Sequence, residues 1–129
     1  MKNFYEKFYI EINKLLNHTD TLLLEKIAKS LIKANKKNKK VIIFGNGGSA
    51  AISSHVSIDL TKNSKIRSIN FNEANLLTCF SNDFGYEKVF SKSLEFYADV
   101  GDVVIIISSS GKSKNLLEAA KICKKKKIL

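Results

Sequence analysis

Two short segments rich in glycine and serine have the composition of phosphate-binding loops. One is 45–49 (GNGGS), directly after the apolar run 41–44, and the other is 108–113 (SSSGKS), after the apolar run 103–107. A segment with helical spacing follows each loop, so serine hydroxyls would lie beside the N–H groups and the positive dipole end of a helix. We therefore expect one phosphate group to bind between the loops. Its expected hydroxyl donors are Ser49, Ser108, Ser109, Ser110 and Ser113.

Either loop alone has an alternative interpretation as an ordinary strand-to-helix turn with a capped helix. Two such loops, each after a buried strand, favour the phosphate site, because ligands of open α/β sheets bind outside the carboxyl ends of the strands. Neither loop has the complete G-x-G-x-x-G or P-loop pattern, which disfavours dinucleotide binding and mononucleotide hydrolysis.

A histidine and a carboxylate one helical turn apart form a second candidate site. His55 and Asp59 stand at i and i+4 in the helix expected from about Ser49 to Leu60, so they project from one face. Such a pair can bind a divalent metal or do acid–base work, although a plain surface ion pair has the same spacing. Asp83, in an expected turn over 81–85, is a further candidate contact, or simply the cap of that turn.

The alternation of strands and helices predicts an α/β fold, a three-layer sandwich with a parallel, doubly wound sheet. Two more helices are expected before the sheet, as a hairpin within residues 1–37 that covers the sheet or pairs with another subunit. The α/β core is expected over 41–129. Because 127–129 looks like the start of another strand, we expect this core to be incomplete and the chain to be a fragment of a longer protein. Expected strands are 41–44, 66–71 and 103–107, and expected core helices are 49–60, 72–80, 86–96 and 113–125.

The composition is that of a single soluble domain. The 129 residues are 44% hydrophobic and 26% charged, and no apolar run approaches the ~18 residues of a membrane span, so no membrane partner is expected. The two cysteines, Cys79 and Cys123, are too few for a disulfide framework and indicate a reducing cytoplasm.

The formal net charge of +10 comes largely from lysines near the ends of expected helices, at 33–40 and 121–127. Cations suit that end of the helix dipole, so these runs favour a solvated surface. Arg67 is the only arginine and aromatic residues do not interleave with the lysines, so no nucleic-acid partner is expected, although nucleic-acid binding stays open as the weaker alternative.

The segments GNGGSAA, SNDFGYEKVFS and GDVVIIISSSGKSKN together resemble the SIS (sugar isomerase) domain, specifically the phosphoheptose isomerase family. The resemblance covers most of the chain. It implies a flavodoxin-like fold and a cytoplasmic homotetramer with active sites shared between subunits and often with zinc. It also implies the conversion of sedoheptulose 7-phosphate to D-glycero-D-manno-heptose 7-phosphate, used in lipopolysaccharide or capsule biosynthesis.

The resemblance also assigns roles to individual residues. Asn46, Gly47 and Gly48 would line the substrate, with Ser49 near its phosphate. His55 matches a metal-ligand histidine, and Asp59 falls where the family has a glutamate that is metal ligand and catalytic base. The remaining matches are Asn82 and Asp83, as a substrate-contacting pair, and Ser108, Ser109, Ser110 and Ser113, as the phosphate loop.

The sequence departs from the family pattern in three ways, and the departures at Asp59 and Asn63 favour a second hypothesis. Asp59 is one methylene shorter than glutamate, which moves the carboxylate by roughly 1 Å. The segment after Leu60 is short, and Asn63 stands in place of an arginine. The family's later glutamine and histidine would lie beyond Leu129. The alternative is therefore a non-catalytic SIS module that binds a sugar phosphate or a protein partner.

Overall fold

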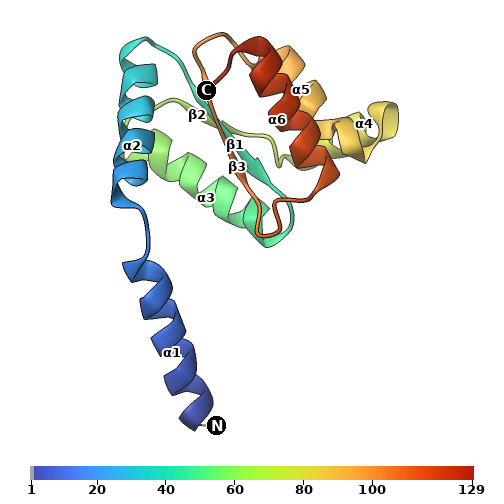
Figure 1. Cartoon of the computed structure of the whole chain (residues 1–129). Coiled ribbons are helices and arrows are strands. Elements are labelled where there is room, and N and C mark those ends of the chain that lie inside the picture. Colours follow the sequence, from blue (N-terminus) through green and yellow to red (C-terminus); the bar gives the residue numbers. More distant parts are fainter. Residues whose placement is uncertain (1) are drawn as a thin grey trace.

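A parallel three-stranded sheet lies at the centre of the molecule, with helices on both faces (Figure 1). The computed structural model describes residues 2–129. The strands are β1 (Val41–Gly45), β2 (Ser68–Asn70) and β3 (Val103–Ile107), in the order β2-β1-β3. Both neighbours run parallel to β1, with Val41 opposite Ser68 on one side and Val103 on the other. The predicted α/β fold with a parallel sheet is confirmed.

The central strand is fully buried because helices cover both of its faces. Its residues 41–44 have no exposed surface, which explains why they form an unbroken apolar run. Alternate side chains enter opposite cores. Ile42 and Phe44 pack with Phe90, Leu94 and other residues of the first core, whereas Val41 packs with Ala34, Ile66 and Val103 in the second.

The helices divide between these two cores. One face of the sheet is covered by α2 (Thr21–Lys36) and α3 (Gly48–Lys62). The other is covered by α4 (Ala74–Phe84), the short 3₁₀ helix η1 (Tyr86–Lys88), α5 (Val89–Tyr97) and α6 (Lys114–Lys126). Most helices begin and end within two or three residues of the predicted limits. Within residues 2–129, none is long and apolar enough to cross a bilayer.

The predicted N-terminal helices form, but their hairpin arrangement is wrong. Asp20 caps α2 by accepting a bond from the Leu23 backbone N–H at 3.0 Å, as expected. The preceding helix, α1 (Lys2–Asn17), projects from α2 away from the sheet (Figure 1). Its apolar side chains stay in solvent, with Phe4 67% and Leu15 68% exposed. The sheet face is covered by α2 and α3 instead.

Two further predicted boundaries differ from the structure. The strand expected over 66–71 is only Ser68–Asn70, although Ile66 and Phe71 on either side of it are buried. The turn expected over 81–85 is helical as far as Phe84, because the first residue with a helix-ending conformation is Gly85, at φ +81°.

The last residue pairs with the outer edge of β3. The Leu129 N–H donates to the Asp102 carbonyl at 3.2 Å, and the Val104 N–H donates to the Leu129 carbonyl at 2.9 Å. These bonds have the pattern of a parallel strand, as the apolar end of the sequence predicts.

Candidate functional site

The two glycine- and serine-rich loops meet at one edge of the sheet, because they follow the neighbouring parallel strands β1 and β3. Between them lies a pocket of about 50 Å³. One water needs about 10–15 Å³ and drug-sized ligands occupy about 300–1,000 Å³, so this pocket suits a small polar group such as phosphate. Its lining residues are Asn46, Ser49, Ile107, Ser108, Ser109, Ser110, Ser113 and Leu116. All five predicted hydroxyl donors are among them.

The first loop depends on Gly45 for its close approach to β3. A Cβ atom at Gly45 would lie 2.8 Å from the Ile107 carbonyl oxygen and 2.8 Å from the Ser49 Cβ. Gly47 adopts φ +52° at the N-cap of α3, a conformation that L side chains rarely adopt. Gly47 and Gly48 therefore shape the start of α3, but they do not line the pocket.

The second loop keeps hydroxyl hydrogens available for an anion. The Ser108 hydroxyl oxygen accepts a bond from the Gly111 N–H at 3.0 Å, and that of Ser110 accepts from the Lys112 N–H at 3.2 Å. Both hydroxyls act as acceptors in these bonds, so each retains its own hydrogen for donation. Ser113 is the N-cap of α6 and makes no capping bond with its side chain.

Asn46 is held by two residues that sequence reasoning missed. Its amide pairs with that of Asn115, through Asn46 Nδ2 to Asn115 Oδ1 at 3.0 Å and Asn115 Nδ2 to Asn46 Oδ1 at 2.9 Å. The Tyr86 hydroxyl also donates to Asn46 Oδ1, at 3.0 Å. Asn115 lies two residues after the predicted phosphate loop and is a polar residue before an apolar pair, which is a weak signal of a buried contact. Tyr86 has no such signal.

His55 and Asp59 meet as predicted, but away from this pocket. His55 Nε2 lies 3.3 Å from Asp59 Oδ2 on α3, and the side chains are 79% and 49% exposed. The other oxygen of Asp59 accepts a bond from the Asn63 side-chain amide at 3.1 Å. The pair can accept and donate protons, but solvent reaches it freely in the single chain.

Asn82 and Asp83 lie in the last turn of α4, so the predicted role of Asp83 as a turn cap is wrong. The Asn82 amide donates to Asp83 Oδ1 at 2.9 Å. Asp83 lines a separate pocket of about 480 Å³ with Phe80, Phe84, Phe96 and Tyr97. The structure therefore does not bring this pair to the pocket between the loops.

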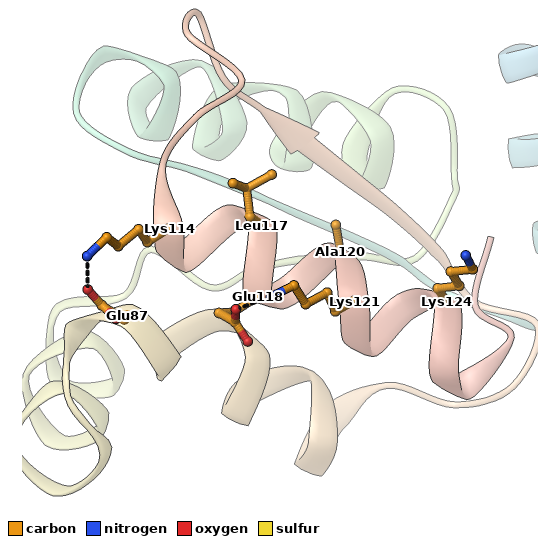
Figure 2. A pocket seen from close by; sticks show the side chains of 7 residues that line it. All are labelled: Glu87, Lys114, Leu117, Glu118, Ala120, Lys121 and Lys124. Atoms are coloured by element: carbon orange, nitrogen blue, oxygen red, sulfur yellow. Dashed lines mark hydrogen bonds and ion pairs between the residues drawn. The ribbon is translucent and has the colours of Figure 1, made fainter.

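A larger pocket, of about 540 Å³, lies along the outer face of α6 (Figure 2). Its charges pair locally, with Lys114 3.0 Å from Glu87 and Lys121 beside Glu118 at 2.5 Å. It is lined by Glu87, Lys114, Leu117, Glu118, Ala120, Lys121 and Lys124. None of the predicted site residues belongs to it, so its size does not make it the functional site.

The expected zinc site has two donors in this chain. Imidazole and carboxylate groups are suitable zinc ligands, but catalytic zinc ordinarily has three protein ligands. Among the residues that the structure describes, no three His, Cys, Asp or Glu side chains gather as a metal site. His55 and Asp59 alone do not complete such a site.

Comparison with known proteins is consistent with this geometry. The family model described as SIS domain matches residues 4–128. Phosphoheptose isomerase 2 of Campylobacter jejuni is 37% identical over 113 residues, which cover 83% of this chain and 56% of that protein. The phosphoheptose isomerase of Sulfurimonas denitrificans is 36% identical over 126 residues, covering 92% and 65%. That of Aliarcobacter butzleri is 33% identical over 128 residues, covering 88% and 68%.

Solved structures show the same fold. A phosphoheptose isomerase from Neisseria gonorrhoeae matches 98% of this chain and 71% of its own, with a TM-score of 0.88 and 27% identity. One from Francisella tularensis matches 98% and 69%, also at 0.88, with 21% identity. The chain spans from just over half to about two thirds of the length of the curated relatives named above. Its matches over nearly the whole sequence show that the chain belongs to the SIS domain family.

Proposed function

We propose that this chain binds the phosphate group of a phosphorylated sugar and acts as an aldose–ketose isomerase. The proposed substrate is sedoheptulose 7-phosphate and the product is D-glycero-D-manno-heptose 7-phosphate. The observation that carries the proposal is the polar pocket between the two loops, where serine hydroxyls and the N-termini of α3 and α6 converge. The names of the curated relatives support the choice of sugar.

The geometry of α3 suits a long open-chain substrate. At about 1.5 Å per residue, His55 lies about 9 Å and Asp59 about 15 Å along the helix from Ser49. Helical side chains lean toward the N-terminus, which shortens both distances. An extended seven-carbon chain with a terminal phosphate is about 9–10 Å long, when each bond adds the length that it adds in an extended polypeptide backbone. We propose that carbons 1 and 2 of a sugar whose phosphate binds between the loops reach the His55–Asp59 pair.

In the proposed reaction Asp59 removes a proton from carbon 1 of the ketose and delivers it to carbon 2. The intermediate is an enediol. The carbonyl oxygen at carbon 2 gains a proton when the enediol forms, and the hydroxyl at carbon 1 loses a proton when the aldose forms, so the two transfers balance. His55, 3.3 Å from Asp59, exchanges these oxygen-bound protons. The phosphate stays bound throughout and fixes the carbon chain in place.

We propose zinc as a partner of the same pair, with His55 and Asp59 as two of its ligands. A divalent metal there would polarise the sugar oxygens. Further ligands must come from outside the described residues of one chain, so the proton transfer above is assigned to side chains alone.

We propose assembly into a tetramer with active sites between subunits. Exposed apolar side chains on α1, and Ile52 and Ile58 on α3, at 54% and 63%, offer surface for such contacts. The α3 residues flank His55 and Asp59. A second copy covering this face would exclude water from the pair, which strengthens electrostatic interactions inside the site.

We propose the cytoplasm as the location, with the product used in lipopolysaccharide or capsule biosynthesis. Cys79 is exposed and Cys123 is half-buried, and both are free thiols. Burial raises the pKa of the Cys123 thiol. A reducing compartment keeps such thiols unpaired.

The test is an assay of the full chain with sedoheptulose 7-phosphate, in which the aldose product is followed by NMR with and without added zinc. Sedoheptulose without the phosphate is the matched control and is expected to be neither bound nor converted. Equal binding of both sugars would contradict the phosphate site.

The same assay separates the second candidate function, a non-catalytic sugar-phosphate-binding module. The solvent-exposed pair on α3, with aspartate in place of glutamate, favours this alternative. Saturable binding of sedoheptulose 7-phosphate without turnover, at protein concentrations where the oligomer is formed, would establish it.

A further inference from the structure

We propose that Asn115 and Tyr86 are positioning residues that hold the Asn46 amide so that its N–H group, and not its oxygen, is available to the phosphate. This inference rests on the proposed phosphate site between the loops. It assigns a role to two residues that lie outside both loops and that the resemblance to known families did not identify.

The orientation begins at a backbone group. The Leu116 N–H, in the first turn of α6, donates to both Asn115 Oδ1, at 3.0 Å, and the Ser113 carbonyl, at 3.1 Å. A backbone N–H can only donate, so the atom it contacts on Asn115 must be the amide oxygen. The other end of the Asn115 amide is therefore its NH₂ group, and the contact with the Leu116 N–H favours this orientation of the side chain.

Asn115 passes that orientation on to Asn46. Asn115 Oδ1 also accepts from Asn46 Nδ2, at 3.0 Å, while Asn115 Nδ2 donates to Asn46 Oδ1, at 2.9 Å. The Tyr86 hydroxyl adds a second donor to Asn46 Oδ1, at 3.0 Å. The oxygen of Asn46 is thus occupied twice, and one of its two Nδ2 hydrogens is not used by these bonds.

This arrangement has an electrostatic consequence for the pocket that Asn46 lines. An amide N–H attracts an anion, whereas an amide oxygen repels it. If the Asn46 amide rotated by half a turn, its oxygen would replace the N–H. The Asn46 oxygen would then face the Asn115 oxygen, and the Asn46 NH₂ group would face the Asn115 NH₂ group, so both hydrogen bonds between the amides would be lost. The network thus selects the orientation that favours phosphate.

The three residues come from three parts of the fold. Asn46 lies after β1, Asn115 lies in α6, and Tyr86 lies in η1, between α4 and α5. Asn115 is 4% exposed, so its bonds are protected from water. Tyr86 is 55% exposed, so its hydroxyl can be removed with little loss of packing.

The test compares the affinity for inorganic phosphate of the wild type and Tyr86→Phe by calorimetry. We expect phosphate binding to weaken roughly three- to tenfold, the effect of one net hydrogen bond, with little change in the unfolding midpoint. In an Asn46→Ala background, Tyr86→Phe is expected to have no further effect, because Tyr86 acts through Asn46. Tyr97→Phe is the matched control, since Tyr97 is 50% exposed and lines a different pocket.

Amide hydrogen exchange supplies a readout that needs no ligand. The Nδ2 hydrogen that Asn46 donates to Asn115 is expected to exchange slowly in the wild type and faster in Asn115→Ala. Phosphate binding that Tyr86→Phe leaves unchanged overturns the positioning role alone. A wild-type protein that binds neither inorganic phosphate nor a phosphosugar overturns the proposed function itself, and with it this role.

Discussion

Asp102 is the one buried charged residue among those that the structure describes, with 1% of its side chain exposed. Its two oxygens accept bonds from the Lys40 N–H at 3.0 Å and the Asp99 N–H at 2.8 Å. The Lys40 ammonium lies 2.6 Å from Asp102 and 2.7 Å from Asp99. These contacts join the beginnings of β1 and β3. The end of the sheet opposite the proposed phosphate pocket is therefore stabilised by a cluster of charged groups that are all paired or hydrogen-bonded.

Asp102→Asn is expected to lower the free energy of unfolding by about 2–3 kcal/mol, because it leaves the partly buried Lys40 ammonium without its main partner. Urea unfolding monitored by circular dichroism measures this change. Asp99→Asn, in which the altered carboxylate is 71% exposed, is the matched control and is expected to have a much smaller effect. Equal effects of the two variants would contradict the importance of burial.

The same cluster predicts a pH dependence. Burial alone would lower the pKa of Lys40, but its hydrogen bonds and charge interactions with Asp102 and Asp99 outweigh burial and raise the pKa above its ordinary value of 10.5. A folded-state pKa that is raised contributes stability that is fully present below the unfolded pKa and lost as the pH rises through the folded pKa. We expect the wild-type protein to lose stability above about pH 10.5, and Asp102→Asn to lose less over that range.

Asp59 is the residue on which the proposed proton transfer depends. Asp59→Asn is expected to lower turnover of sedoheptulose 7-phosphate at least about 100-fold, while the affinity for the phosphosugar changes little, since Asp59 does not line the phosphate pocket. Asp59→Glu extends the carboxylate by one methylene and is expected to retain or raise turnover. Steady-state kinetics together with calorimetry separate the two effects, and turnover that survives in Asp59→Asn would remove this residue from the mechanism.

The site residues differ in how well the sequence predicts them. The hydroxyls of both loops follow predicted strands directly, so their meeting at one sheet edge follows from parallel pairing alone. Tyr86 and Asn115 reach Asn46 through contacts across 40 and 69 residues, which no local pattern encodes. The polar residues around Asp83 predict a turn, but polar residues do not end a helix unless the backbone leaves the helical conformation.

At the scale of elements, the two strand–loop–helix units around β1 and β3 form the sheet edge at which we propose the phosphate site. The sequence predicts the limits of both strands to within one residue. Buried parallel strands are continuous apolar runs, and here glycine or serine follows each run. The short strand β2 and the end of α4 were predicted less well. β2 ends at Asn70 although β1 continues to Gly45, because the Asn72 side-chain amide pairs with the Gly45 backbone in place of a further strand residue. The end of α4 depends on the conformation of Gly85.

Gly45→Ala is expected to destabilise the protein by about 1–3 kcal/mol and to weaken phosphosugar binding, because the added Cβ would press β1 away from Ile107 and the start of α3. Thermal unfolding and calorimetry measure the two effects. Gly48→Ala is the matched control. A Cβ at Gly48 meets nothing within 4 Å, and alanine in the first turn of α3 should be neutral or stabilise by about 0.4–1 kcal/mol. A Gly45→Ala protein as stable as the wild type would show that the two loops have room to separate.

At the scale of the whole molecule, α1 and the α/β core have different roles. The core buries its own apolar residues around the sheet, whereas α1 carries a row of exposed ones, including Phe8 at 50% and Ile12 at 39%. The sequence correctly predicts the helix and its apolar face through the spacing of these residues. It cannot predict which surface covers that face, because the spacing carries no information about the partner.

If copies of the chain assemble through α1 as proposed, Phe8→Glu is expected to reduce the mass of the protein in solution toward that of a single chain, because it places a charge on the apolar face of α1. Sedimentation velocity measures this change, and circular dichroism checks that helicity is retained. Asn13→Glu, on the same helix, is the matched control for added charge. If both variants keep the wild-type mass, α1 is not an interface between copies.

The outer edge of β3 has one more consequence, for the behaviour of the protein in concentrated solution. An apolar groove of about 440 Å³ lies beside Leu129, between β3 and the α2 residues Leu23 and Ile27. Apolar side chains exposed along such a groove are a surface on which neighbouring molecules can associate. The charge of +10 keeps molecules apart at low ionic strength. Added salt screens that repulsion, so light scattering at a fixed protein concentration is expected to rise with salt.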